Sequence, residues 1–254
     1  MSTGKKKRGF LGRSLDDLEA IHAALAKAFS ETAAPIMDLV AAQTRDPFRI
    51  LVGTILSART KDAVTAEAVK RLFAVAPNLE TLEQLSLERI QELIYPVGFY
   101  KAKAQHLLDL PKVLREKYAG KIPHTVEELI ELPGVGRKTA NLVVALGFGL
   151  PAICVDTHVH RINNRLGIVR TESPLETEMA LRKGLPQKLW IPWNSIFVSF
   201  GQTRCKPIGP KCEGCPIAQL CPDLATRQAT PKKKPAPKGG KTKKPLTKKK
   251  GSAI

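Results

Sequence analysis

Apolar residues recur with a helical period of about 3.6 along most of the chain, and long alternating strand patterns are scarce. The expected helices begin at Leu15 behind a Ser14 cap and at Pro47 behind Asp46, and further ones cover roughly residues 61–74, 87–94, 101–117, 137–147, 157–166, 174–184 and 192–202. Thr125 and Glu128 have the spacing of a capping box. The pattern predicts an all-α fold with short Gly- and Pro-containing connections.

The 254 residues are enough for one large or two small domains. No run of eighteen apolar residues occurs, so a membrane span is not expected. The first ten residues, MSTGKKKRGF, lack the apolar stretch of a secretory signal. These features favour a reducing compartment, in which clustered cysteines bind metal and do not form disulfides.

The net charge of +18 belongs mainly to the two ends of the chain. Residues 1–13 carry +5 and residues 224–254 carry +11, which leaves +2 for residues 14–223. A Lys-, Pro- and Gly-rich tail cannot bury enough apolar surface to fold, so both ends are expected to be disordered. Attraction to a polyanion is the favoured role of the C-terminal tail. A solubilising tail and a nuclear localisation signal are the alternatives.

Four of the five cysteines lie close together near the C-terminus, with the spacing C-x6-C-x2-C-x5-C. They are Cys205, Cys212, Cys215 and Cys221. Most zinc modules separate two cysteine pairs by about a dozen residues or more, whereas four cysteines are the usual ligands of a [4Fe–4S] cluster. The spacing favours the cluster over a zinc site, a disulfide pair or unrelated thiols. The fifth cysteine, Cys154, lies in an apolar stretch and is expected to be buried.

The segment LPGVGRKT, residues 132–139, has the layout of a helix–hairpin–helix. Gly134 and Gly136 flank Val135 and allow turn dihedrals and close backbone approach. The N–H groups of this turn and of the helix that starts near Arg137 suit phosphate oxygens, which bind DNA without reading its sequence. A plain junction between two helices, with no ligand, is the alternative.

Lys138 stands in the first turn of that helix, on the side opposite its apolar stripe. Asp156 follows at the head of the next helical pattern. Together they offer a nucleophile and an electrostatic partner, provided that they face one cleft. An ordinary surface lysine and a helix N-cap are the alternatives for the two positions.

The hairpin LPGVGRKTANLVV, the segment VDTHVHR (155–161) and the cysteine loop, in this order, resemble the endonuclease III family. The resemblance covers roughly residues 20–222. It implies a six-helix domain of residues 40–150 and an iron–sulfur cluster domain of residues 14–39 and 151–223. Disordered basic tails of residues 1–13 and 224–254 flank these two domains.

The resemblance also implies a bifunctional DNA glycosylase and abasic-site lyase that flips a damaged nucleotide out of the duplex. Lys138 would attack C1′ and form a Schiff base, Asp156 would stabilise the cationic sugar, and β-elimination would cut the strand 3′ to the abasic site. The [4Fe–4S] cluster would not act as a redox catalyst in base excision. The expected partner is double-stranded DNA with damaged pyrimidines or abasic sites, bound by a monomer in a bacterial cytoplasm; a nucleus is the alternative compartment.

Relatives of the family narrow the substrate. Adenine-excising relatives carry a glutamate in the early helix, where this chain has the apolar run of residues 50–56, and thymine-mismatch relatives have tyrosine in place of Lys138. Both differences favour oxidised pyrimidines. The rival interpretation is a non-catalytic DNA-binding module, which requires neither Lys138 nor Asp156.

Further DNA contacts follow from matching family positions. Arg59 stands where family members commonly have the glutamine that fills the hole left by the flipped base, and a phosphate contact is its alternative role. Phe99 matches a residue that wedges the other strand, with a core aromatic as the alternative. Arg137 is both a DNA contact and a candidate cation beside the nucleophile, and His158 supports the Asp156 segment. Lys206 and Lys211 present charge from the cysteine loop, although Gly209 stands where another basic residue is expected.

Overall fold

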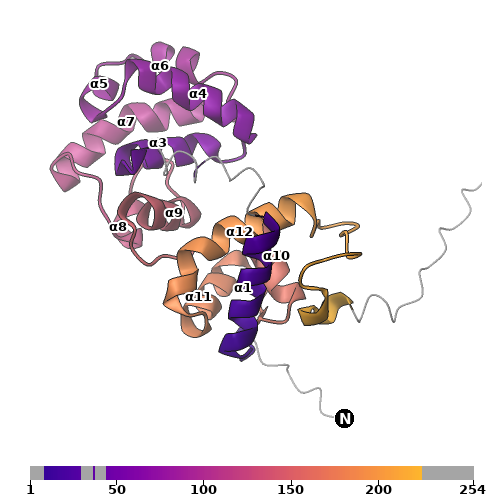
Figure 1. Ribbon diagram of the computed structural model, residues 1–254. Coiled ribbons are helices and arrows are strands. Elements are labelled where there is room, and N and C mark those ends of the chain that lie inside the picture. Colours follow the sequence, from indigo (N-terminus) through magenta and orange to yellow (C-terminus); the bar gives the residue numbers. More distant parts are fainter. Residues whose placement is uncertain (1–8, 30–36, 38–43, 225–254) are drawn as a thin grey trace, which may run out of the picture.

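A computed structural model describes residues 9–29, 37 and 44–224, and these form two groups of helices (Figure 1). The first eight residues of the predicted N-terminal tail and residues 225–254 of the C-terminal tail lie outside the described part. No helix in the described ranges is both long and apolar enough to cross a membrane.

The first group packs around an apolar core that includes residues from Met37 to Ala152. Its helices are α3 (Pro47–Ser57), α4 (Asp62–Val75), α5 (Leu79–Glu83), α6 (Leu87–Ile94), α7 (Tyr100–Tyr118), α8 (Val126–Leu129) and α9 (Arg137–Phe148).

The second group has a separate core that joins both ends of the described chain. It contains α1 (Leu15–Phe29), α10 (Thr157–Arg165), α11 (Pro174–Gly184) and α12 (Trp190–Thr203), with short 3-10 turns at Gln187–Leu189 and Ala218–Leu220. Helix α1 lies beside α12, although about 160 residues separate them in sequence (Figure 1). The fully buried Trp193 belongs to this core, whereas Trp190 is only partly buried.

Helix ends follow the caps expected from the sequence. Ser14 Oγ accepts a hydrogen bond from Asp17 N at 3.1 Å, and Asp46 Oδ1 accepts one from Phe48 N at 2.9 Å. Such caps satisfy N–H groups that have no partner within the helix. The prediction of an all-α fold is confirmed. The sequence pattern missed α5 and one small ladder, in which β1 (Gly9–Phe10) pairs antiparallel with β2 (Val169–Arg170).

Helices α3 and α9 pack side by side, and their ends show that they run antiparallel. A methyl group at Gly147, near the end of α9, would lie 3.2 Å from Pro47 Cα at the start of α3. The last turn of α3 therefore lies at the same end of the pair as the first turn of α9, which carries Lys138.

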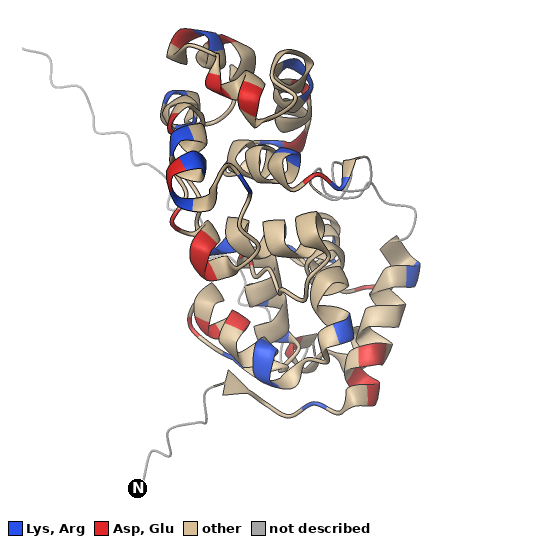
Figure 2. Cartoon of the chain, turned by 90° about the vertical axis from the view of Figure 1, so that its left-hand side faces the viewer, with Lys and Arg blue, Asp and Glu red and all other residues tan. Residues whose placement is uncertain are grey.

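Lysine, arginine, aspartate and glutamate residues are interspersed over both groups of helices (Figure 2). This mixture agrees with the small net charge of residues 14–223. Binding of a polyanion by the described part therefore depends on local positions and not on a large overall charge.

Candidate active site and cysteine loop

The first turn of α9, which follows the glycine-containing turn, presents Lys138 to solvent. Gly134 has φ +73°, and a methyl group there would lie 2.5 Å from His106 Nδ1, so only glycine fits between the turn and α7. Gly136 caps α9 without a side-chain hydrogen bond, which leaves the first N–H groups of the helix open to an external acceptor. The Lys138 side chain is 57% exposed.

Asp156 uses its two carboxylate oxygens for different tasks. Oδ1 accepts hydrogen bonds from His158 N at 2.8 Å and Val159 N at 2.9 Å, which caps α10. Oδ2 lies 3.8 Å from Lys138 Nζ, and the carboxylate is only 11% exposed. The cap therefore fixes the carboxylate in an orientation that faces the amine, so the N-cap role and the predicted partner role are compatible. The structure thus brings together the two residues that the sequence singled out.

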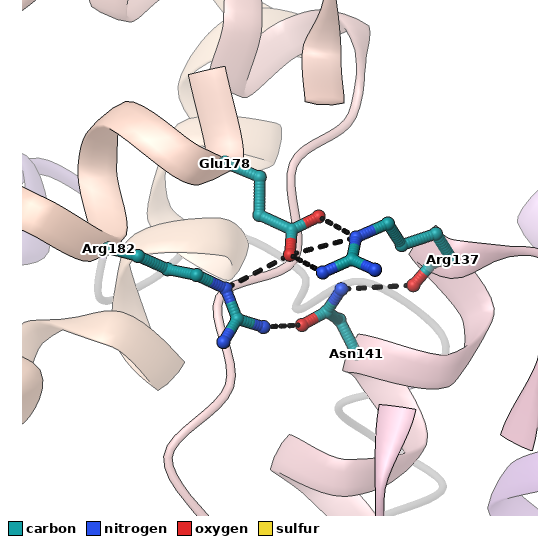
Figure 3. A network of polar contacts seen from close by, with 4 residues as sticks. All are labelled: Arg137, Asn141, Glu178 and Arg182. Carbon is teal, nitrogen blue, oxygen red and sulfur yellow. Dashed lines mark hydrogen bonds and ion pairs between the residues drawn. The ribbon is translucent and has the colours of Figure 1, made fainter. Parts of the chain in front are cut away.

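Arg137 does not stand free beside Lys138. Its Nη2 lies 3.0 Å from Glu178 Oε1, and Arg182 Nε lies 3.0 Å from the same oxygen (Figure 3). Asn141 completes the network, because its amide donates to Arg137 O at 3.0 Å and accepts from Arg182 Nη2 at 2.8 Å. The charge of Arg137 is therefore compensated by Glu178, and the network ties α9 to α11.

His158 faces inward and supports the Asp156 segment. A methyl group at Gly201 of α12 would lie 2.4 Å from His158 Nδ1, so the ring occupies the space beside this glycine. Burial lowers the pKa of His158, which favours the neutral imidazole. Arg161 Nη2 lies 3.1 Å from His158 Nδ1 and donates to Cys205 O at 2.9 Å. This guanidinium links the active-site helix α10 to the cysteine loop.

The four cysteines of the C-terminal loop line one cavity of about 30 Å³. Arg165 Nη1 donates to Cys205 Sγ at 3.3 Å. Burial raises the pKa of the Cys215 and Cys221 thiols, which are both only partly exposed. Four sulfur donors around one cavity fit a metal cluster. Among the described residues, no three His, Cys, Asp or Glu side chains are placed to hold a single metal ion.

The tip of this loop carries Lys206 and Lys211, both exposed as the sequence analysis expected. Gly209 has φ +62°, which favours glycine at this position over the basic residue expected there. Arg204 Nη1 donates to Glu213 O at 2.8 Å and holds the loop from inside. The two lysines are therefore available to an anion.

Arg59 and Phe99 lie together at the surface. The Arg59 guanidinium is 5.6 Å from the centre of the Phe99 ring, and both residues have positive φ, +54° and +58°. Phe99 is 64% exposed, which excludes the alternative that it is a core aromatic. Two positions that the sequence placed on separate segments thus form one exposed pair.

Sequence reasoning missed Lys103, Asn141, Glu178 and the arginines of α10. Lys103 occupies a core-facing position of its helix, and a lysine there was the available signal. Arg161 and Arg165 stand four residues apart and share one helix face, but their acceptors lie about 40 residues away. No local pattern identifies such partners.

Comparison with known proteins agrees with this arrangement. Residues 52–187 match the HhH-GPD superfamily of base excision DNA repair proteins. The chain is 49% identical to endonuclease III of Thermotoga maritima over 176 residues, which cover 69% of this chain and 83% of that protein.

Two solved structures have similar folds. A non-covalent endonuclease III–DNA complex matches with a TM-score of 0.75 at 35% identity, covering 86% of this chain and all of that one. A trapped endonuclease III–DNA covalent intermediate matches with a TM-score of 0.74 at 35% identity, covering 85% and 100%. The motifs, the fold and these similarities agree, and the chain belongs to the endonuclease III family of the HhH-GPD superfamily.

Proposed function

We propose that this protein is a bifunctional DNA glycosylase and abasic-site lyase that removes oxidised pyrimidines from duplex DNA. The observation that carries the proposal is the pairing of Lys138 Nζ with Asp156 Oδ2 at 3.8 Å, beside a helix N-terminus with no side-chain cap. A DNA-binding module would need the helix N-terminus, but not an exposed amine beside a nearly buried carboxylate. Relatives solved with DNA, one of them as a trapped covalent intermediate, support the enzyme over the module.

The proposed reaction starts when a flipped nucleotide enters the site. The neutral Lys138 amine attacks C1′, a C1′–N bond forms, and the bond to the base breaks. Asp156 Oδ2 stabilises the positive charge that develops on the sugar. Sugar ring opening gives a Schiff base, loss of a C2′ proton expels the 3′ phosphate, and water then releases Lys138. The cap on Oδ1 keeps Oδ2 aimed at the amine throughout.

Borohydride trapping on duplex DNA with an abasic site tests the nucleophile. The wild-type chain should form a covalent adduct, and Lys138→Gln should not. Lys112→Gln is the matched control, because Lys112 on α7 is 76% exposed and lies 4.0 Å from Glu116. A Lys138→Gln variant that traps as well as the control would refute the assignment.

Asp156→Asn separates the two tasks of the carboxylate. The amide oxygen still accepts from His158 N and Val159 N, so the cap of α10 remains, while the negative charge near Lys138 is lost. We expect excision of the damaged base to slow by roughly 100-fold or more, which is the usual scale of one electrostatic group. Unchanged excision by a folded variant would leave Asp156 with a capping role only.

We further propose that Cys205, Cys212, Cys215 and Cys221 hold a [4Fe–4S] cluster, since all four line one cavity. Arg161 and Arg165 connect this loop to α10, so a bound cluster would stabilise the helix that carries Asp156. Iron and sulfide analysis of purified protein tests this proposal. Four irons and four sulfides per chain are expected, and bound zinc without sulfide would contradict it.

The remaining assignments complete the proposal. We propose a six-helix domain of residues 40–150 and a cluster domain of residues 14–39 and 151–223; the two separate apolar cores support a division into two domains, although the first core reaches Met37 and Ala152. Gly134, Gly136, Lys206 and Lys211 would contact the DNA backbone, and a monomer would act in a bacterial cytoplasm. Excision from a panel of duplexes tests the substrate class: oxidised pyrimidines should be removed in preference to alkylated or mismatched bases.

A further inference from the structure

Lys103, in the first turn of α7, is a buried lysine with three hydrogen-bond acceptors. Its side chain is 6% exposed, and Nζ donates to Leu56 O at 2.8 Å, Ala58 O at 2.6 Å and Thr60 Oγ1 at 3.1 Å. Burial lowers the pKa of Lys103 to about 8. Lysine is almost never fully buried unless it is paired, and here all three partners are neutral oxygens at the end of α3 and just after it.

The acceptors belong to the end of α3 and to the segment that follows it. The last carbonyls of a helix have no partner within the helix and carry partial negative charge, so an ammonium there is stabilising. Ala58 and Thr60 stand on either side of Arg59. Lys103 therefore holds the backbone before Arg59 and the Thr60 side chain after it, and Arg59 itself adopts positive φ.

Thr60 connects the same lysine to a second loop. Its hydroxyl oxygen accepts from Lys103 Nζ at 3.1 Å and from Gly98 N at 3.2 Å. A methyl group at Gly98 would lie 2.5 Å from Arg59 O, so the two loops are in direct backbone contact. Gly98 immediately precedes Phe99, and Lys103 N donates to Phe99 O at 3.1 Å. The Lys103 ammonium thus contacts the Arg59 segment directly and reaches the Phe99 segment through the Thr60 hydroxyl, whereas the bond from Lys103 N to Phe99 O belongs to the helix backbone.

The exposed pair adopts a conformation that needs this support. A left-handed backbone is strained for a residue other than glycine, and both Arg59 and Phe99 adopt it. The pair also lies at the active-site end of the first group of helices. The end of α3 and the start of α9 share that end, and the turn before α9 packs against His106, one turn after Lys103 on α7.

We propose that Lys103 is a positioning residue that sets the geometry of the Arg59–Phe99 pair and thereby determines discrimination between bases opposite the lesion. This inference rests on the proposed glycosylase function. A guanidinium only donates hydrogen bonds, so it distinguishes bases by where they place their acceptors. It does so only while its own position is fixed, and the three bonds from Lys103 supply that fixed position.

The experiment compares single-turnover excision of an oxidised pyrimidine opposite adenine and opposite guanine, using the full-length protein. Lys103→Met keeps an unbranched side chain only one atom shorter and removes the ammonium group that donates all three hydrogen bonds. The ratio of the faster to the slower excision rate should decrease about tenfold toward one, which is the scale of one defined arginine–base contact. Borohydride trapping on a preformed abasic site should change much less, because it does not depend on the opposite base.

Matched variants separate positioning from general damage. Lys103→Arg keeps a cation and should retain most of the discrimination, and Lys112→Met changes an exposed lysine of the same helix and should retain all of it. In Lys103→Met combined with Arg59→Gln, the ratio should equal that of Arg59→Gln alone, because Lys103 acts through Arg59. If Lys103→Met does not fold, Thr60→Val replaces it, since valine removes only the hydroxyl between Lys103 and Gly98.

The outcomes are distinct. A wild-type ratio near one, an unchanged ratio in folded Lys103→Met or Thr60→Val, or additive effects in the double variant would overturn the proposal. Wild-type protein that neither traps nor excises would instead refute the proposed function, and this inference would fall with it. Loss of discrimination with trapping retained supports both.

Discussion

Replacing Glu178 by glutamine should destabilise the junction between α9 and α11. The Glu178 side chain is 5% exposed and accepts from Arg137 Nε and Nη2 and from Arg182 Nε, at 3.0–3.2 Å. Glutamine has almost the same size but directs an NH₂ group at one guanidinium. The change therefore removes the negative charge shared by two arginines without creating a cavity (Figure 3).

The magnitude follows from the burial of the three groups. Breaking a buried ion pair costs about 3–5 kcal/mol when the remaining charge has no water. The Arg137 and Arg182 side chains are 31% and 30% exposed, so hydration offsets part of this cost. A loss of about 2 kcal/mol in the free energy of unfolding is expected, close to the value of a hydrogen bond to a charged group. At this chain length it corresponds to a decrease of roughly 4–8 °C in Tm.

Denaturant unfolding measures the effect, with Glu116→Gln as the control. Glu116 is 61% exposed and lies 4.0 Å from Lys112, so its change should be within about 0.5 kcal/mol. A double-mutant cycle with Arg182→Met should give a coupling energy of about 1 kcal/mol or more. If Glu178→Gln costs no more than the control, the network does not stabilise the junction and the reasoning is wrong.

Three further predictions follow from other parts of the chain. Deleting residues 225–254 removes eleven positive charges and should flatten the salt dependence of DNA binding. The slope of log K against log salt concentration should fall by about 0.9 for each phosphate that the tail neutralises, while single-turnover excision stays nearly intact. An unchanged slope would show that the tail does not touch DNA. Gly134→Ala should reduce borohydride trapping and lower the free energy of unfolding by about 1–3 kcal/mol, because the new methyl group would lie 2.5 Å from His106 Nδ1. A variant with wild-type stability and wild-type trapping would contradict the packing described. Burial lowers the pKa of His22 below 6.5, so its contribution to stability is complete above about pH 6.5 and is lost as the pH falls toward the lowered value. His22→Phe should therefore make the decrease in the free energy of unfolding between pH 6.5 and pH 5 shallower. Identical pH profiles of the variant and the wild type would refute this.

Local chemistry made the helices predictable. Periodic apolar positions and caps such as Ser14 and Asp46 act within about four residues, and the observed bounds of α6 and α11 coincide with those expected from the pattern. The β1–β2 pair escaped prediction because two residues on each side carry no periodic signal, and 159 residues separate Phe10 from Val169 in sequence.

Some residues of the candidate site could be predicted from local sequence, and others could not. The order of the hairpin, the aspartate segment and the cysteine loop indicated the family, and Lys138, Asp156 and the four cysteines could be named from their types and spacing. Arg137 shows the limit of this approach. Its sequence position suggested a cation beside Lys138, but its partner Glu178 is 41 residues away and becomes visible only in the fold.

The sequence by itself determined most of the helical segments, the nucleophile and carboxylate candidates, the four clustered cysteines and the family that they resemble, because these depend on neighbours along the chain. Only the tertiary structure decided that Asp156 Oδ2 faces Lys138 Nζ, that Phe99 is exposed beside Arg59, and that Lys103 is buried. Burial and the choice of a partner depend on which surfaces meet after the chain has folded. Lys103 and Leu56 are 47 positions apart, and no local sequence pattern predicts their contact.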